Sequence, residues 1–415
     1  MGERTMINAT TPKPNRRANS QTLSIDVALL LIVASLLVIG LLMVYSASWD
    51  ASLSVTKSKS QNEIFFKQVI WVVLGVIGAA ALSFFDYHRY RNLVVWMMAG
   101  VIIMLLIVLV IREVRYNSAR SLVGGSIQPA EFAKLVSILY LSVWLTNKKD
   151  MLKDFRNYLA PLSFGVGFIV ALILAQPDLS AGITVLVLGI MLLFLAGGDW
   201  KHVAIVVAVG VLGFIFLINV MPTGKIRFAQ YIAGLQNPNE SSYHIKRTFE
   251  AIIKGGIFGV GLGKANTKFT GLPLPHTDSI FAVLTEETGL VGALFVVSLF
   301  VLLIWRGYKI ARNAPDQLGV LISFGLTSWI VIEAMINFMV IVGLLPVAGN
   351  ALPFISAGGS SMAATMAAIG IVMNVARQGS SKKIPERSGT SETVNLRGRD
   401  WRRGVSGADR YGEIK

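Results

Sequence analysis

The side chains of this protein that could do chemistry gather where a polar, glycine-rich stretch meets a long apolar run. Asp278 stands in the segment His276-Thr277-Asp278, directly before the apolar residues that begin at Ile280. A carboxylate at such a junction lies where a membrane helix meets water, so it can be ionised and still reach a substrate held in lipid. It could act as a general base. It could equally cap the following helix together with Thr277, since both side chains accept hydrogen bonds from free backbone N–H groups.

Other polar residues lie beside apolar runs in the same way. Glu131 and Lys134 are three residues apart, a spacing that lets them pair on one helix face. Asp178 occupies a three-residue turn between two apolar runs, where it could line a cavity or simply face water. Glu286 and Glu287 project from different faces of the helix after Asp278, so at most one of them is expected beside it. Further polar candidates are Arg120, Lys246, Arg247, Lys264 and Ser360.

Two other kinds of site are weaker interpretations of the stretch before Asp278. His244 and His276 could bind zinc together with Asp278, but their separation matches no short metal-ligand spacing. The glycines between Gly255 and Gly263 could suggest a phosphate-binding loop, yet the lysine that follows them precedes Ala265 and not Ser or Thr, and no strand leads into them. A flexible or re-entrant loop segment beside the site is favoured instead.

The elements that must position these residues are membrane helices. Hydrophobic residues make up 54% of the 415 residues and charged residues only 15%, and the apolar residues fall in blocks long enough to cross a bilayer. We therefore expect an all-α polytopic membrane protein with about ten transmembrane helices. They are expected at residues 25–46, 65–85, 92–111, 132–146, 159–175, 180–197, 202–221, 280–304, 317–343 and 359–376.

The distribution of charge predicts how these helices are oriented. The net charge of +15 lies mainly in short loops and a tail beside the spans, as the positive-inside rule requires, and it does not indicate nucleic-acid binding. The basic leader, 1–24, has no signal-peptide cleavage pattern, and the basic tail, 377–415, has little that could form a core and is expected to be disordered. Both ends of the membrane domain, 25–376, are then cytoplasmic. The absence of cysteine excludes disulfides and thiolate metal sites.

The one large loop, 222–279, is expected outside the membrane between the seventh and eighth helices. Within it, Ser242 to Lys254 spaces apolar residues at helical intervals, which predicts an amphipathic helix at the membrane surface. The polar candidates around Arg120, Glu131, Asp178, Asp278 and Ser360 all fall on this extracytoplasmic side. The sequence therefore predicts that the protein acts at the outer face of the membrane.

In their order and spacing, these motifs resemble those of the SEDS (shape, elongation, division and sporulation) family of integral-membrane peptidoglycan glycosyltransferases. The likeness runs from about residue 26 to residue 377. It rests on Met43 to Ser48, Asn117 to Arg120, Gln128 to Lys134, Gln176 to Leu179, Gly259 to Gly263, His276 to Ala282, Glu286-Glu287, Asn337 and Gly343 to Ser361.

The resemblance implies about ten helices, a large extracytoplasmic loop between helices seven and eight, and Asp278 as the catalytic residue. It also implies that Arg120, Glu131, Lys134 and Asp178 line or support the cavity, with His276, Thr277 and Ser360 as further candidates to contact the substrate. Where the family commonly has a glutamate, this chain has Leu274, so a mechanism that needs a second carboxylate there is in doubt.

The substrate that the resemblance implies is lipid II, a disaccharide-peptide on undecaprenyl diphosphate, polymerised into glycan strands at the outer face of the bacterial cytoplasmic membrane. Asp278 would take the proton of the acceptor hydroxyl as that hydroxyl attacks the donor. The diphosphate leaves well and needs charge neutralisation, and no organic cofactor is implied. The groups that could neutralise it are a divalent cation (Mg²⁺ or Mn²⁺) and the basic residues Arg120, Lys246, Arg247 and Lys264.

The implied partners are a class B penicillin-binding protein transpeptidase, other division or elongation proteins, and membrane lipid. Division is preferred to elongation because of the polar leader and the long basic tail. The main alternative is a transporter that flips lipid II across the bilayer. Transporters tend to carry polar features near the bilayer midplane and symmetry between halves. The absence of a convincing internal repeat and the gathering of polar motifs at one face favour the enzyme.

Overall fold

The computed structural model describes residues 25–54, 63–111, 127–147, 160–176, 178–220 and 222–382. The predicted leader, 1–24, and all but the first six residues of the predicted tail lie outside these ranges. The described α-helices are α1 (Val27–Ser54), α2 (Glu63–Phe84), α3 (Tyr90–Ile111), α4 (Pro129–Asn147), α5 (Ala160–Ala175), α6 (Leu179–Leu195), α7 (Trp200–Val220), α8 (Pro222–Gln236), α9 (Tyr243–Gly255), α10 (Ile280–Arg312), α11 (Gln317–Ile341) and α12 (Gly359–Lys382).

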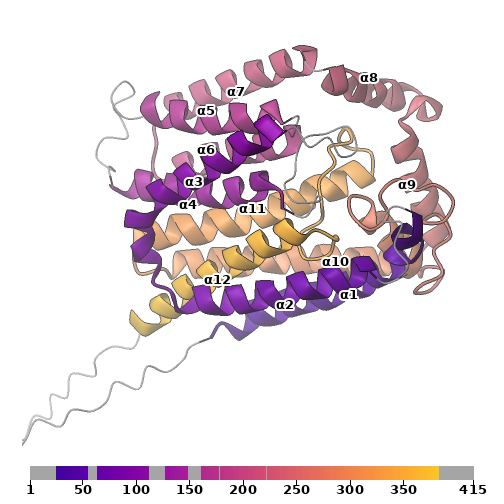
Figure 1. Cartoon of the computed structure of the whole chain (residues 1–415), viewed down its shortest axis with the longest axis horizontal. Helices are drawn as coiled ribbons and strands as arrows, with labels where there is room; N and C mark the ends of the chain where they lie inside the picture. The colour runs from indigo at the N-terminus through magenta and orange to yellow at the C-terminus, as the bar shows by residue number, and fades with distance from the viewer. Residues whose placement is uncertain are drawn as a thin grey trace, which may run out of the picture.

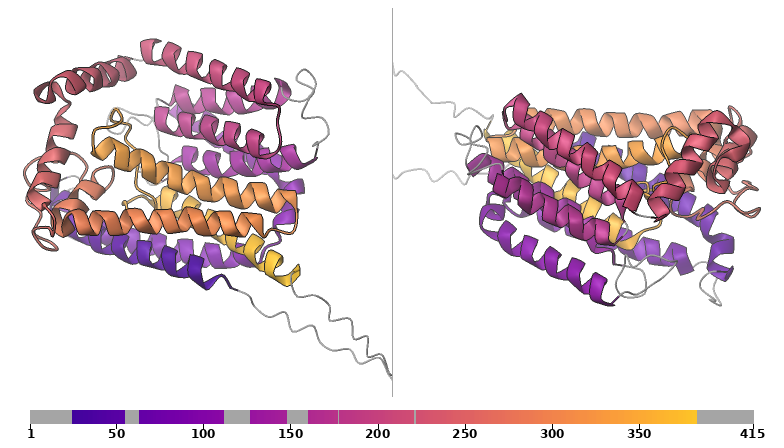
Figure 2. Two further views of the ribbon diagram at one scale, coloured as in Figure 1. Left: turned by 180° about the vertical axis from the view of Figure 1, so that it is seen from behind. Right: turned by 90° about the horizontal axis from the view of Figure 1, so that it is seen from above.

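The ten helices α1 to α7 and α10 to α12 run side by side along the long axis of the molecule, whereas α9 crosses one end of them (Figure 1). By length and composition, α1, α2, α3, α10, α11 and α12 can each cross a membrane, and α5, α6 and α7 contain shorter apolar stretches. Helices form here because a backbone in lipid must satisfy its own N–H and C=O groups. Seen from behind and from above, the ten helices again form one bundle (Figure 2).

All ten predicted spans are present, so the expected all-α polytopic membrane fold is confirmed. Three helices continue well beyond their predicted ends: α1 ends at Ser54 and not at 46, α10 at Arg312 and not at 304, and α12 at Lys382 and not at 376. The extension of α10 contains Arg306, Lys309 and Arg312. Their long apolar stems can lie along the apolar layer while their charged ends reach water, so the helix can continue past the edge of that layer.

The large loop contains a helix that the sequence did not predict. The amphipathic helix expected from Ser242 to Lys254 is confirmed as α9, with Ser242 as its N-cap. The residues before it, for which the sequence analysis gave only a place in the large loop, form α8. Pro222 stands at the first position of α8, where its missing N–H is not needed and its fixed backbone angle favours a helix.

The outer surface of the bundle is apolar, unlike that of a soluble protein, and its interior, although mainly apolar, also holds polar groups. Large apolar side chains such as Trp96, Val110 and Phe164 are more than three-quarters exposed on the outside of the helices. Hydroxyl groups such as those of Ser142 and Thr327 are buried and donate to carbonyls one turn earlier on their own helices. This arrangement suits a bundle whose outer surface contacts lipid.

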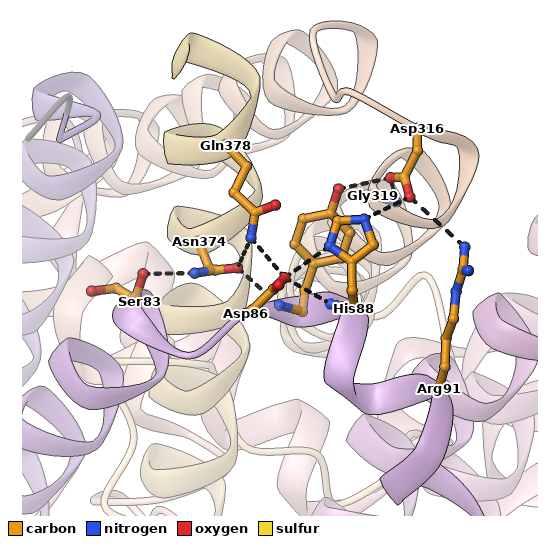
Figure 3. A network of polar contacts seen from close by, with 9 residues as sticks. Ser83, Asp86, His88, Arg91, Asp316, Gly319, Asn374 and Gln378 are labelled. Carbon is orange, nitrogen blue, oxygen red and sulfur yellow. Dashed lines mark hydrogen bonds and ion pairs between the residues drawn. The ribbon is translucent and has the colours of Figure 1, made fainter. Parts of the chain in front are cut away.

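A polar network ties three elements together at the end of the bundle where α12 ends (Figure 3). Asp316 caps the start of α11 and accepts from Gly319 N at 2.9 Å and from Tyr87 Oη at 2.7 Å. The ring nitrogens of His88 lie 2.8 Å from Asp86 Oδ1 and 3.1 Å from Asp316 Oδ2.

Asp86 also joins α12 to this network. Its carboxylate accepts from Gln378 Nε2 at 2.9 Å. Partial burial opposes ionisation of Asp86, but hydrogen bonds from Gln378 and His88 outweigh it and lower the pKa of the Asp86 carboxyl to about 2. The ionised carboxylate of Asp86 therefore joins the turn after α2 to the end of α12, and Asp316 joins the same turn to the start of α11.

We expect Asp316→Ala to destabilise the protein by about 2–3 kcal/mol, because it removes a helix cap and several hydrogen bonds to one charged group. A thermal melt of the full-length protein in detergent measures this. Asp199→Ala is the matched control, since Asp199 is more exposed and caps only the start of α7, through Lys201 N at 3.0 Å. Its effect should be about 1 kcal/mol. Equal losses of stability in the two variants would contradict a special role for the network.

Candidate active site

Asp278 lies at the end of the bundle opposite the network of Figure 3, directly before α10. It does not cap that helix. The N-cap is Ser279, which makes no side-chain cap bond and donates instead to Pro273 O at 2.6 Å. The capping role that the sequence left open for Asp278 and Thr277 is therefore not what the structure has.

Three successive carbonyl groups fix the backbone around Asp278. His276 O accepts from Ala357 N at 2.9 Å, and Thr277 O accepts from Ser356 Oγ at 2.7 Å. Asp278 O accepts from Asn337 Nδ2 at 3.0 Å, and the same amide group donates to Asn350 O at 2.7 Å. The segment has no regular structure of its own, so α11 and the segment before α12 hold it in place.

The side chain of Asp278 lines a pocket of about 230 Å³ that brings together residues from several elements. Six of the residues singled out in the sequence lie there, and small residues close the pocket from the side of α12. The charged and polar lining residues are Gln128, Glu131, Lys134, Asp178, Ser180, Thr277, Asp278, Asn350, Ser360 and Ser361.

Lys134 lines this pocket and is about 1% exposed. Its ammonium group lies 2.8 Å from Glu131 Oε1 and also contacts a carboxylate oxygen of Glu333 on α11. The pairing of Glu131 with Lys134 that their spacing predicted is thus present, and Glu333 is a second partner that the sequence interpretation missed. In this buried cluster, two acidic side chains therefore share one basic side chain.

Asp178 joins the two sides of the pocket. It caps α6 by accepting from Ala181 N at 3.1 Å and Ser180 Oγ at 2.9 Å, and it also accepts from Gln128 Nε2 at 2.9 Å. The backbone N–H of Gln128 in turn donates to Ser360 Oγ at 3.1 Å. Of the two interpretations that the sequence left open, lining a cavity is the one that the structure supports, because Asp178 lines the pocket and is only 4% exposed.

The glycine-rich segment packs against a break in α10. Gly289 has a φ of 70°, which interrupts α10 and leaves carbonyl groups free. Val260 N donates to Glu286 O and Gly261 N donates to Glu287 O, both at 3.0 Å. A Cβ atom on Gly259 would lie 2.2 Å from Glu287 O, so only glycine fits. The segment was expected to be flexible, and backbone hydrogen bonds to α10 hold it instead.

The two glutamates after Asp278 support this segment from different sides. Glu286 accepts from Asn266 N at 2.9 Å and from Thr267 N at 3.3 Å. Glu287 accepts from Lys268 Nζ at 2.9 Å and from Ser46 Oγ of α1 at 2.5 Å. Neither glutamate is among the residues that line the Asp278 pocket.

A groove of about 1280 Å³ lies beside the pocket, between α8, α9 and the segment after α11. Lys246 lines it, as does Arg227 on α8, which donates to Val347 O at 3.2 Å. Lys254 also lines the groove but pairs with Glu250 at 2.7 Å. Arg227 was missed because no helix was predicted in its part of the large loop. The available signal was a basic residue in the loop that also holds Asp278.

The remaining predicted site residues lie elsewhere. Arg247 pairs with Glu250 at 2.5 Å, and Lys264 is exposed in a turn of the glycine-rich segment. His276 contributes its carbonyl to the fixed backbone but its side chain is not among the pocket residues, and burial lowers the pKa of its imidazole. Arg120 lies outside the described residues.

His244 separates the groove from the Asp278 pocket. Its Nε2 lies 2.9 Å from Ser279 Oγ, whose proton is donated to Pro273 O, so Nε2 carries the ring proton. Burial and the positive charge of Arg227 lower the pKa of His244, which is therefore neutral at pH 7. Among the described residues, no group of three His, Asp or Glu side chains could hold a metal ion, so the zinc alternative gains no support.

Comparison with known proteins gives a family match over most of the chain. Residues 27–381 match the family model FTSW_RODA_SPOVE, described as cell cycle protein. The chain is 37% identical to the stage V sporulation protein E of Bacillus subtilis (strain 168) over 362 residues, which cover 85% of this chain and 97% of that protein. It is 33% identical to a probable peptidoglycan glycosyltransferase FtsW of Geobacter sp. (strain M18), covering 84% and 96% of the two chains.

Solved structures agree with the sequence matches. The fold is similar to that of the rod shape determining protein RodA of Thermus thermophilus, with a TM-score of 0.60 and 25% identity over 86% of this chain and 98% of that one. A chain from a structure described as "Structural coordination of polymerization and crosslinking by a peptidoglycan synthase complex" has a TM-score of 0.68 and 25% identity, covering 86% and 98%.

We expect Lys134→Met to destabilise the protein by about 3–5 kcal/mol, because it leaves the buried carboxylates of Glu131 and Glu333 without their cation. Thermal unfolding of the purified full-length protein measures this. The double variant Lys134→Met/Glu333→Leu should regain part of the loss, since only one buried carboxylate remains. If the double variant is less stable than the single variant, the charge argument is wrong.

Proposed function

This chain belongs to the FtsW, RodA and SpoVE family of cell cycle proteins, and from that premise we propose that it polymerises lipid II into glycan strands. Its relatives include proteins named as peptidoglycan glycosyltransferases, and the chain is a membrane glycosyltransferase of this kind. The resemblance to the SEDS family drawn from the motifs is thereby confirmed. The observation that carries the proposal is the polar pocket around Asp278, together with a groove of about 1280 Å³ on the other side of His244.

In the proposed reaction, Asp278 is the general base. Its carboxylate accepts the proton of an acceptor sugar hydroxyl while that oxygen attacks the anomeric carbon of the donor. The new glycosidic bond forms as the bond from the anomeric carbon to the diphosphate breaks, and the diphosphate leaves with its electron pair. A diphosphate is a good leaving group, so no second carboxylate is needed to protonate it.

The leaving diphosphate needs positive charge that the pocket does not supply. Around Asp278 the pocket has three carboxylates and one ammonium group, and that ammonium group already binds Glu131 and Glu333. We therefore place the diphosphate toward the groove, near Arg227 and Lys246. The apolar walls of the same groove suit the first units of a polyprenyl chain. Arg247 and Lys264, which the sequence also suggested, are less suited by their positions.

The pocket carboxylates do not fit a metal centre held by the protein. Glu131 already binds Lys134, and Asp178 already accepts from the amide of Ala181, the hydroxyl of Ser180 and the side chain of Gln128. The proposed reaction therefore has no step on a metal ion held by the protein. A divalent cation, which the sequence left as a candidate, would have to be bound by the substrate's own diphosphate.

We propose that the pocket faces the outside of the cell and that both ends of the membrane domain are cytoplasmic. The end of the bundle opposite the pocket carries Arg306, Lys309 and Arg312 on α10 and His88 to Arg91 after α2, which supports this orientation by the positive-inside rule. We also propose a role in cell division with a class B penicillin-binding protein as partner. Relatives named FtsW and the likeness to a chain of a peptidoglycan synthase complex support this role.

We expect Asp278→Asn to lower the rate of lipid II polymerisation at least 100-fold, because the amide cannot accept the proton. The assay uses the full-length protein purified with its cognate transpeptidase and supplied with lipid II, and polymer is measured on gels. Undiminished polymer from Asp278→Asn would remove Asp278 as the base. If wild type makes no polymer but rapidly flips lipid II in vesicles, the protein is the transporter that the sequence left as the alternative.

Neutralising the groove cations should act on substrate binding. We expect Arg227→Gln and Lys246→Gln each to raise KM for lipid II about tenfold, because each removes a charged donor to the diphosphate. Lys225→Gln is the matched control, since Lys225 lies on α8 but is not among the residues that line the groove. If all three variants raise KM equally, general surface charge and not the groove holds the substrate.

A further inference from the structure

A small cavity lies behind Asp278, between the pocket and the groove. Its volume is about 10 Å³, which is room for the centre of one water molecule. It shares Asp278, Gly349 and Asn350 with the pocket, and it shares His244 and Val347 with the groove. Asp278 therefore has a second face, turned away from the pocket in which substrate would bind.

One lining residue of this cavity, Asn337, carries a buried polar atom that has no partner among the described residues. Asn337 is 2% exposed, and its Nδ2 is fully used by the carbonyls of Asp278 and Asn350. Its Oδ1 is buried and accepts no hydrogen bond from the described residues. A buried amide oxygen left without a donor is costly, and a water molecule in the adjoining space is the usual remedy.

We propose that this cavity is an internal water site and that Asn337 is a positioning residue that holds the water against the Asp278 carboxylate. One hydrogen of the water is donated to Asn337 Oδ1 and the other to Asp278. Because the water lies on the far side from the pocket, it stays when substrate displaces solvent from the front. Asp278 then keeps a donor to its ionised form, which is the form a general base needs.

The proposed water does not change the contacts of the other charged and titratable groups around Asp278. His244 closes the cavity toward the groove, with its ring proton committed to Ser279. The titratable groups that face Asp278 or its neighbours from the surrounding elements are Glu131 and Lys134 on α4, Asp178 before α6, Arg227 on α8, His244 on α9 and Glu333 on α11.

The inference rests on the proposed glycosyl transfer, and its test uses a variant that changes no polar atom. Val340 lines the cavity one turn beyond Asn337, so Val340→Ile should fill the space and exclude the water. We expect kcat to fall with KM unchanged, and the acidic limb of the pH–rate profile to move up by about one unit, because the carboxylate loses one donor. Asn337→Leu should shift the limb in the same direction.

The matched control is Val331→Ile, which adds the same methyl group to α11 at a position that does not line the cavity. Its profile should superimpose on that of wild type. A shift as large as that of Val340→Ile, or no shift in Val340→Ile, overturns the inference. If Asn337→Leu does not fold, Val340→Ile alone decides.

A second measurement separates this inference from the proposed function. A high-resolution structure of the wild-type protein should contain a water within hydrogen-bond distance of Asn337 Oδ1, and the structure of Val340→Ile should not. Absence of that water in wild type overturns the inference even if the enzyme is active. If wild type forms no polymer, the proposed reaction is wrong. A water beside Asn337 Oδ1 would still show that the cavity is a water site.

Discussion

Backbone groups that leave a helix within or beside a membrane must find partners inside the protein, and the site depends on how this chain meets that requirement. Residues 255–279 and 342–358 contain little regular helix. The first segment uses free carbonyls at the break of α10, and the second supplies donors to the carbonyls of His276 and Thr277. Asn337 bridges the two. The position of Asp278 thus follows from satisfying backbone hydrogen bonds as much as from packing side chains.

Charge within the bundle obeys a related rule. Lys134 is buried among helices that face lipid, and it is tolerated because two carboxylates surround it. The same arrangement commits the ammonium group of Lys134, so it is not available to an anion in the pocket. In the proposed reaction the positive charge for the diphosphate therefore comes from Arg227 and Lys246 in the groove.

The sequence predicts the local features of this protein well and the long-range ones poorly. Apolar blocks locate all ten membrane helices because length and hydropathy are properties of single segments. The pair of Glu131 and Lys134 follows from helical spacing, but Glu333 is 199 positions from Lys134 and no spacing rule connects them. The amphipathic pattern finds α9 and overlooks α8, and with it Arg227, because a short helix rich in polar residues resembles a loop. Six of the residues singled out line the pocket. Helical spacing alone could not bring them together, and it was the family resemblance that grouped Glu131, Lys134 and Asp178 around one cavity.

The backbone around Asp278 is fixed by donors from two later segments of the chain, and this has a consequence for biosynthesis. The donors to its neighbouring carbonyls come from Asn337 and from Ser356 and Ala357, and Ser360 at the start of α12 completes the pocket wall. These residues follow Asp278 in the sequence, so the ribosome makes them after it. A nascent chain that has inserted only the helices up to α10 therefore contains Asp278 but not the donors that fix the backbone around it. The pocket is complete only once α11 and α12 have joined the bundle.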